Sequence, residues 1–567
     1  MSPSRPAVLT TAAALVLAAT AGLGLRLYRL AEQPLLSDEL HAIRAVFDLE
    51  MEDILTSYRE ADHSIPLSAL YEWRVESGAP LTERFMRLPG MLAGLVLLLA
   101  VPAAAGRWLG WDRAVVAAWL LAISPGLVLY SRIARPYAPA VLFGTLAIFA
   151  FYAWWRSGRH RWAAAYVAAA AAAFWFSTVT APFLGAPFVF AAVRKAVAPR
   201  RGPSLVAITA VGIAAAAALA GVLAPAWDSF FAMTEGKTGL GGANWASLLQ
   251  TLELQAGSGH RAVAAAVWLA ALAGLVSLAR RRPDFALLTA VAYVTQVAGL
   301  WIAEPMGLAA PAIWNRYLLV ALPVALVWVA EALARLAAVR LPGALRRAPA
   351  VAVAALLAGL ALAGPFADPA FRYGSFVHGN DFVAFHRAPA FVPDGIPAPY
   401  ERIAEEGGAV VELTGLPTWV QDLHLSVYQG HHRQRVLLAP AELRLFGPEL
   451  ALRNHVEPVP DALLAAPARW LVVHHHPVRE IESLRYAEHP HGTMPVPPLV
   501  RQLGRRNGRR AARYFEAAWG APDLGDPRVW VWDLDRVRAL PRRSDSSGEA
   551  AQPGRPAGAP SPATRRP

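Results

Sequence analysis

Long apolar runs separated by short polar segments fill the first 365 residues of the chain. A helix needs roughly 17–25 mostly apolar residues to cross the hydrocarbon core of a bilayer, and about eleven runs meet that requirement by hydropathy. The candidate spans lie near residues 7–29, 86–105, 114–130, 137–155, 162–177, 180–195, 204–226, 260–279, 285–303, 316–338 and 349–365. The pattern predicts a polytopic α-helical membrane domain over residues 1–365 with about eleven transmembrane helices.

Two runs leave alternatives open. The segment "STVTAP" is only a slight break between 162–177 and 180–195, and if these runs formed one element, every later span would change sides. The first run, with Arg5 and the small residues "LAATA", also has features of a cleaved signal peptide. It continues to residue 25, longer than the apolar region of a usual signal peptide, so a first transmembrane helix is favoured.

The positions of the cations orient these helices. With the N-terminus inside, the inside connections hold clusters of Arg and Lys, whereas the outside connections are mostly longer and mix acids with bases. The positive-inside rule then predicts a cytoplasmic N-terminus and an extracytoplasmic loop at 30–85 with interfacial helices. The heavy use of Ala, Arg, Gly and Pro is typical of a GC-rich bacterial genome, which would make the membrane a bacterial inner (plasma) membrane.

The hydrophobic pattern of the sequence changes after residue 365. "GGAVVELTG" and "ARWLVVHHHP" are β-branched runs bounded by turn residues, which is typical of buried strands. "APYERIAEE", "PAELRLF" and "PPLVRQLGRR" can form helices between them. Residues 366–540 are therefore predicted to form an extracytoplasmic α/β domain. The Pro-, Gly- and Ser-rich residues 541–567 are predicted to be a disordered tail.

Composition excludes several classes of function. The chain is 56% hydrophobic and only 17% charged, which again favours a membrane protein. It has no cysteine, so disulfides, thiolate catalysis and Cys-bound metal are excluded. The net charge of +12 lies in short clusters between apolar runs rather than on a basic face, so nucleic acid is not an expected partner.

The first candidate for chemistry is the acidic pair in "LLSDELHAIRAVFD", Asp38 and Glu39. Apolar residues follow it at helical spacing up to Leu55, which predicts one amphipathic helix at the membrane surface. Asp38 is then a helix cap, a catalytic carboxylate, or both.

Arginines on the predicted outer side form the second candidate. "YSRIARPYAPAVLF" places Arg132 and Arg135 at the outer end of two spans, and "WNRYLLVALP" places Arg316 and Tyr317 at the outer end of a later one. An arginine there can snorkel to the interface without a function. It can also bind an anionic lipid phosphate through its planar guanidinium group. Topology puts these residues and the acidic pair on one leaflet, which favours the functional interpretation.

Taken together, "LSDELHA", "DHSIPLSALYEW", "FMRLPGMLAG", "YSRIARPYA" and "NRYLLVALP" resemble the bacterial glycosyltransferases of family 39, which have the GT-C fold. The resemblance covers residues 7 to about 340, with the motifs in the family's order. Family members usually carry His-Pro-Pro-Leu-Tyr-Tyr where this chain has His63-Ser64-Ile65-Pro66-Leu67 and, later, Tyr71.

The resemblance implies sugar transfer from a polyprenyl-phosphate carrier to a protein, lipid or glycan acceptor outside the membrane. It implies Asp38 as general base, with Glu39 orienting the acceptor or the base. The remaining residues are expected to bind the substrate or the lipid phosphate: His63, Tyr71, Arg84, Arg87, Arg132, Arg135, Tyr137, Arg316 and Tyr317. No cofactor is required, although Asp38 and Glu39 could hold a divalent cation. The alternatives are a lipid-linked sugar transporter or flippase and a non-catalytic envelope-polysaccharide assembly protein.

The histidine run at 474–476 in the C-terminal domain invites a metal-binding interpretation, with His431 and His432 as further imidazoles. No carboxylate lies at a recognisable ligand spacing, so a structural role is favoured.

Overall fold

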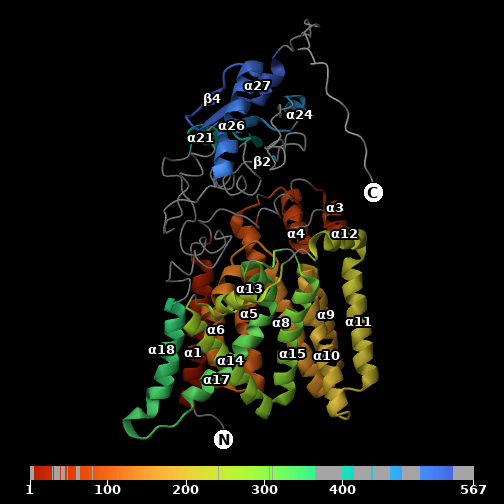
Figure 1. Cartoon of the computed structure of the whole chain (residues 1–567), viewed down its shortest axis with the longest axis vertical. Helices are drawn as coiled ribbons and strands as arrows, with labels where there is room; N and C mark the ends of the chain where they lie inside the picture. Colours follow the sequence, from red (N-terminus) through yellow and green to blue (C-terminus); the bar gives the residue numbers. More distant parts are fainter. Residues whose placement is uncertain are drawn as a thin grey trace, which may run out of the picture.

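The computed structural model of the 567-residue chain describes residues 5–28, 30, 39, 42, 45–46, 49–58, 64–79, 81–239, 242–258, 260–305, 307–309, 311–363, 397–413, 436–437, 460–465, 467–475 and 498–540. Long helices form a bundle, and the C-terminal domain lies beyond one end of it (Figure 1). The N-terminus lies at the opposite end of the bundle. The two predicted parts, a helical membrane domain and an α/β domain, are both present.

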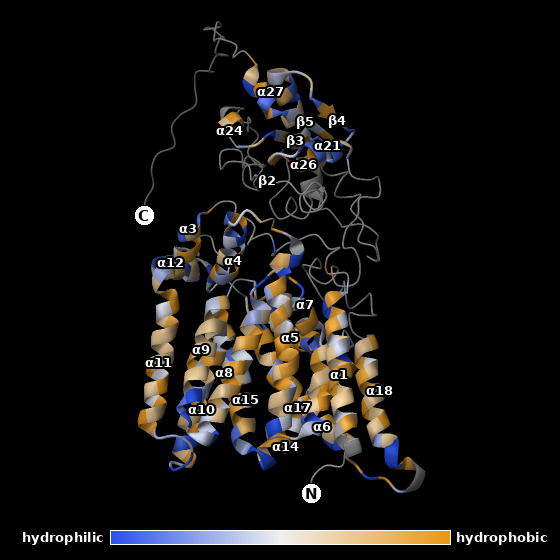
Figure 2. Cartoon of the chain, turned by 180° about the vertical axis from the view of Figure 1, so that it is seen from behind, coloured by the Kyte–Doolittle hydropathy of each residue, from blue (hydrophilic) through white to orange (hydrophobic). Residues whose placement is uncertain are grey.

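Eight stretches of helix in the described part of the chain are long and apolar enough to cross a membrane. They are formed by α1 (Arg5–Leu27), α5 (Glu83–Trp108), α8 (Tyr137–Ser157), α11 (Leu205–Leu223) with α12 (Trp227–Lys237), α14 (Arg261–Arg281), α15 (Pro283–Ala303), α16 (Pro311–Leu318) with α17 (Leu322–Ala337), and α18 (Ala348–Ala363). In Figure 2 these helices carry mostly the colour of hydrophobic residues along their length.

The other three predicted spans are shorter helices. The span at 114–130 is broken into α6 (Trp111–Ile123) and α7 (Pro125–Tyr130) at Pro125, which has no N–H for the helical hydrogen bond. The uncertain pair at 162–195 is two helices, α9 (His160–Phe176) and α10 (Ala181–Val197), separated by a 3-10 turn at Thr178–Thr180. The prediction of two elements there is confirmed.

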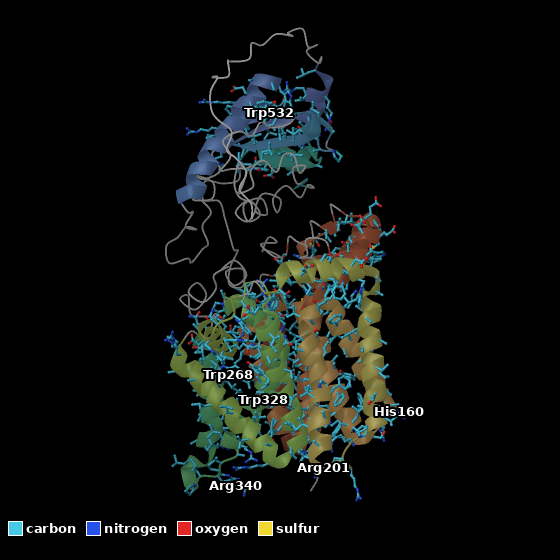
Figure 3. All side chains as sticks on the ribbon, turned by 45° about the vertical axis from the view of Figure 1, so that its right-hand side comes forward. His160, Arg201, Trp268, Trp328, Arg340 and Trp532 are labelled. Atoms are coloured by element: carbon cyan, nitrogen blue, oxygen red, sulfur yellow. The ribbon has the colours of Figure 1, made fainter. Side chains whose placement is uncertain are left out.

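The cationic connections share one end of the bundle. His160 at the start of α9, and Arg201 and Arg340 from two of the connections, lie at the end away from the C-terminal domain (Figure 3). This agrees with the alternation of charged connections along the sequence. A buried carboxylate holds three helices together near this end: Glu331 of α17 accepts from Arg113 of α6 at 3.0 Å and from Ser277 of α14 at 2.5 Å.

Short helices lie at the other end, beneath the C-terminal domain (Figures 1 and 2). They include α3 (Met51–Thr56), α4 (Ile65–Glu76) and α12. The Tyr58 N–H donates to Ser229 Oγ at 2.7 Å, which joins α12 to the segment after α3.

The prediction of one continuous amphipathic helix after Asp38 is wrong. The backbone at Glu50 is extended, and a separate helix, α3, starts at Met51. Ile54 of this helix is buried together with Ala45 and Leu49, so apolar packing is retained across the break.

The C-terminal domain contains a five-stranded sheet in the order β2-β1-β3-β5-β4. The strands are β1 (Val410–Leu413), β2 (Val436–Leu437), β3 (Trp470–His474), β4 (Leu524–Gly525) and β5 (Val529–Asp533). β1 runs parallel to β2 and β3, whereas β5 is antiparallel to β3 and β4. Helices α21 (Pro399–Glu406), α24 (Pro460–Ala465), α26 (Pro498–Trp519) and α27 (Leu534–Ala539) accompany the sheet.

Strands β1 and β3 and the helices α21 and α26 confirm four predicted elements. The helix predicted at "PAELRLF" and the tail at 541–567 lie outside the described residues. The strand β5, "VWVWD", was not predicted.

Candidate active site

A buried ion pair joins the first extramembrane segment to helix α5. Arg87 Nε and Nη2 donate to the two carboxylate oxygens of Glu39 at 2.9 and 2.8 Å. The Arg87 side chain is 1% exposed and that of Glu39 is 5% exposed. Arg87 Nη1 also donates to the Leu30 carbonyl at 2.9 Å. Two parallel bonds of this kind are strong and directional, so the pair fixes Glu39 firmly against α5.

The same carboxylate holds the connection between α7 and α8. The Ala134 N–H donates to Glu39 Oε1 at 2.7 Å, across 95 residues of sequence. A small apolar core surrounds the ion pair and draws on the first loop, α4, α5 and this connection: Ala42, Val46, Leu67, Tyr71, Met86 and Ala134. Burial of these side chains keeps water away from the ion pair, which strengthens it.

Arg132, in the same connection, caps the first helix. Its Nη1 donates to the carbonyls of Leu25 and Arg26, both at 2.9 Å. Helix α1 ends at Leu27, so these carbonyls belong to its last turn and lie at the negative end of the helix dipole. Burial lowers the pKa of Arg132 to about 9, and the Arg87 guanidinium adds to this effect. Arg132 is 2% exposed, so it does not snorkel to the membrane surface.

A second cluster lies where the predicted phosphate-binding residues meet. The Tyr137 hydroxyl lies 3.4 Å from Arg135 Nη2 and 3.3 Å from Arg316 Nη1. Both guanidinium carbons lie 5.6 Å from the centre of the Tyr137 ring. Arg135 comes from the α7–α8 connection and Arg316 from α16, 181 positions later in the sequence. Two arginines around one phenol are an arrangement suited to a phosphate group.

The remaining predicted residues divide into three groups. Tyr71 is buried, and its hydroxyl donates to the Met86 carbonyl at 2.5 Å. Burial, with the Glu39 charge adding to it, raises the pKa of Tyr71 above its usual range, so the phenol stays neutral. Arg84 is exposed at the start of α5 and Tyr317 is half-buried. Asp38 and His63 lie outside the described residues.

Arg26, near the end of α1, is a residue that the sequence analysis missed. It is 1% exposed and lies within an apolar run. An ionisable residue inside a predicted span is by itself a signal of function, and that signal was present in "GLGLRLYRL".

The described residues do not fit a divalent cation at Glu39. Both of its oxygens already accept bonds from Arg87, and one also accepts from the Ala134 amide. No group of three or more His, Asp or Glu side chains suited to a metal occurs in the described part of the chain. No step of the chemistry proposed for this protein is therefore assigned to a metal.

His474 belongs to a buried polar cluster in the C-terminal domain. Its Nε2 lies 2.9 Å from Glu412 Oε2 and 3.2 Å from the Tyr400 hydroxyl, which itself donates to Glu412 at 3.0 Å. Side chains from β1, β3 and α21 thus satisfy one another inside the domain, in agreement with a structural role.

Residues 70–227 match the family model of the dolichyl-phosphate-mannose-protein mannosyltransferases. The matched segment includes α5 and the α7–α8 connection, and so most of both clusters. The match confirms the resemblance to family 39 that the motifs predict, over 158 of the 567 residues. The comparison with curated proteins finds no match.

The chain is also similar to solved structures of two other proteins. One is the archaeal oligosaccharyltransferase AglB from Archaeoglobus fulgidus, in complex with an inhibitory peptide and a dolichol-phosphate: 11% identity, 83% of this chain and 70% of the other covered, TM-score 0.43. The other is ArnT from Cupriavidus metallidurans bound to undecaprenyl phosphate: 14% identity, 81% and 92% covered, TM-score 0.48. These values are too low to transfer a ligand or an activity.

Proposed function

We propose that this protein transfers a sugar from a polyprenyl-phosphate carrier to an acceptor hydroxyl on the extracytoplasmic face of a bacterial inner membrane. The observation that carries the proposal is the Arg135–Tyr137–Arg316 cluster. The α7–α8 connection links this cluster to the buried Glu39–Arg87 pair. The family match over residues 70–227 supports glycosyl transfer as the reaction.

The proposed orientation follows from charge. The connections rich in Arg lie at the end of the bundle away from the C-terminal domain (Figure 3). By the positive-inside rule that end faces the cytoplasm, with the N-terminus, and the two clusters face outward. The lipid-linked donor would then enter from the outer leaflet.

The donor phosphate would bind between Arg135 and Arg316. A phosphate that leaves the anomeric carbon gains negative charge, and fixed guanidinium groups in a dry site stabilise that charge without reorganising. The Tyr137 hydroxyl keeps the two guanidinium groups together and is itself a donor to a phosphate oxygen.

Asp38 is the proposed general base. Its carboxylate would take the proton of the acceptor hydroxyl while that oxygen forms a bond to the anomeric carbon. The bond between the anomeric carbon and the phosphate oxygen breaks, and its electron pair leaves with the lipid phosphate. Direct displacement inverts the anomeric centre. The neighbouring Glu39, held by Arg87 and Ala134, would fix the position of Asp38 rather than accept a proton itself.

The acceptor is a protein, a lipid or a glycan, and the C-terminal domain would help to select it because it lies above the outward end of the bundle (Figure 1). Deletion of the gene should cause one lipid-linked sugar to accumulate. Its identification by mass spectrometry would name the donor.

The central test is sugar transfer by the purified protein with a panel of polyprenyl-phosphate sugars. Asp38→Asn should lower kcat by about 100-fold or more, the usual contribution of a general base. Glu52→Gln, at an exposed acid of α3 in the same extramembrane segment, is the matched control and should retain activity. Full activity of Asp38→Asn would remove Asp38 as the base. Failure of the wild-type protein with every donor would favour a transporter or an assembly protein.

A further inference from the structure

Arg26 is a buried cation that the proposed reaction does not use. It lies in the last turn of α1, and its Nη1 donates to the Gly22 carbonyl at 2.9 Å. Its Nη2 lies 3.4 Å from the Leu121 carbonyl of α6. Both acceptors are neutral, and in the described part of the chain no carboxylate pairs with Arg26 and its Nε has no hydrogen-bond partner. A full charge in this setting is costly, because a membrane interior offers it neither water nor a counter-ion.

The helices around Arg26 are shaped to accept it. A methyl group at Gly94 of α5 would lie 3.1 Å from Arg26 Nε and 2.5 Å from the Ser131 Cβ. A methyl group at Gly22 would lie 3.2 Å from Arg26 Nη1. Glycine at both positions leaves the space that the guanidinium and the α7–α8 connection occupy. The Arg26 side chain is therefore packed between the helices and does not extend to the membrane surface.

Arg26 also lies directly behind the connection that carries the proposed phosphate site. Its own carbonyl accepts a bond from Arg132 at 2.9 Å, and Gly94 touches both Arg26 and Ser131. Burial and the charges of Arg87 and Arg26 lower the pKa of Arg132, while the Glu39 carboxylate acts in the opposite direction. Three arginines, Arg26, Arg87 and Arg132, are thus gathered around the start of the connection that ends in Arg135, and Glu39 pairs with one of them. Such a cluster is relieved when an anion binds beside it.

We propose that Arg26 is a positioning residue for the donor: its unneutralised charge strengthens the binding of a lipid-linked phosphate at the Arg135–Tyr137–Arg316 cluster. The inference rests on the proposed function, because it takes that cluster as the phosphate site. The role needs the positive charge of Arg26, not its hydrogen bonds. The hydrogen bonds alone would serve only to hold α1 against α6.

The test measures binding rather than transfer. The full-length protein in nanodiscs is titrated with undecaprenyl phosphate, and the Kd is taken from the rise of its melting temperature. Arg26→Met and Arg26→Gln should each weaken binding by about ten-fold, a loss of the size that one buried charge can contribute. Arg26→Lys should stay within about three-fold of the wild type because it keeps the charge. Arg159→Met, at an exposed cation of the opposite end, is the matched control.

Two further ligands test which part of the lipid the charge of Arg26 affects. Uncharged undecaprenol should give a melting shift that does not depend on residue 26. Inorganic phosphate at the same concentrations should give no shift, and a shift as large as that of the lipid would overturn the lipid-linked phosphate as ligand.

The variants separate the possible failures. Arg26→Gln keeps a donor for the Gly22 carbonyl, so it provides the neutral variant if Arg26→Met does not fold. Wild-type affinity in Arg26→Gln would overturn the inference while leaving the proposed function intact. If the wild-type protein itself binds no undecaprenyl phosphate, the proposed donor fails, and the inference fails with it.

Discussion

Arg87→Met should destabilise the protein more than any neutral change on the same face of α5. The substitution removes both bonds to Glu39, at 2.9 and 2.8 Å, and the bond to the Leu30 carbonyl. It leaves the Glu39 carboxylate buried with the Ala134 amide as its one remaining partner among the bonds described above. Breaking a buried pair by removing one partner costs about 3–5 kcal/mol, most of it from the charge left behind.

A double-mutant cycle separates the pair from the packing of Arg87. Glu39→Gln in the Arg87→Met background removes the stranded charge, so the double variant should recover part of the loss. The coupling energy should fall within about 1–3 kcal/mol, the range for residues in direct contact. The free energy of unfolding can be followed by Trp fluorescence during denaturation in detergent, since the chain has 19 Trp residues.

The control for this prediction lies on the same helix. Arg84, one turn earlier, is exposed, and Arg84→Met should change stability by no more than about 0.5 kcal/mol. Transfer by Arg87→Met should fall by about 100-fold because the loop that carries Asp38 is no longer fixed. If Arg87→Met is as stable as Arg84→Met, the ion pair does not hold this junction together, and the role assigned to Glu39 is wrong.

Three other substitutions test separate parts of the molecule. Tyr137→Phe removes the hydroxyl shared by Arg135 and Arg316, so the KM for the lipid-linked donor should rise about ten-fold, the equivalent of about 1.4 kcal/mol; an unchanged KM would contradict a phosphate site there. Glu331→Leu strands the cations around it and should lower the melting temperature clearly, with the KM for the donor unchanged in the protein that remains folded. His474→Phe leaves a buried carboxylate without one partner, which should cost about 1–3 kcal/mol; faster proteolysis confined to the C-terminal domain would show this, and equal rates would contradict it.

The sequence predicts those features that depend on the bilayer. Hydropathy identifies the spans because a helix must be long and apolar to cross lipid, whatever its neighbours are. The same criterion separates α9 from α10 only weakly, since a 3-10 turn at Thr178–Thr180 needs little change in composition. The helix predicted after Asp38 fails at Glu50 for a similar reason. Apolar residues on both sides of the break pack into one cluster, so periodicity alone does not reveal it.

The sequence motifs name residues of the candidate site but do not show which of them pair. Glu39 and Arg87 belong to two different sequence motifs. Their hydrogen bond joins positions 48 residues apart and depends on how the first loop folds onto α5. β5 is a different case. Its alternating "VWVWD" is typical of a strand, so this element can be predicted from the sequence.

The α7–α8 connection explains why these separate residues act together. In this connection the Ala134 amide donates to Glu39, Arg132 donates to a carbonyl at the end of α1, and Arg135 donates to the Tyr137 hydroxyl. Each of these three contacts is made with a different part of the chain. A movement of the connection that changes one contact therefore changes the other two. The loop of Glu39 and the proposed phosphate cluster are for this reason not independent of each other. A cation such as Arg26, buried behind this connection, can then affect donor binding without touching the donor, because it acts on the one segment that both clusters share.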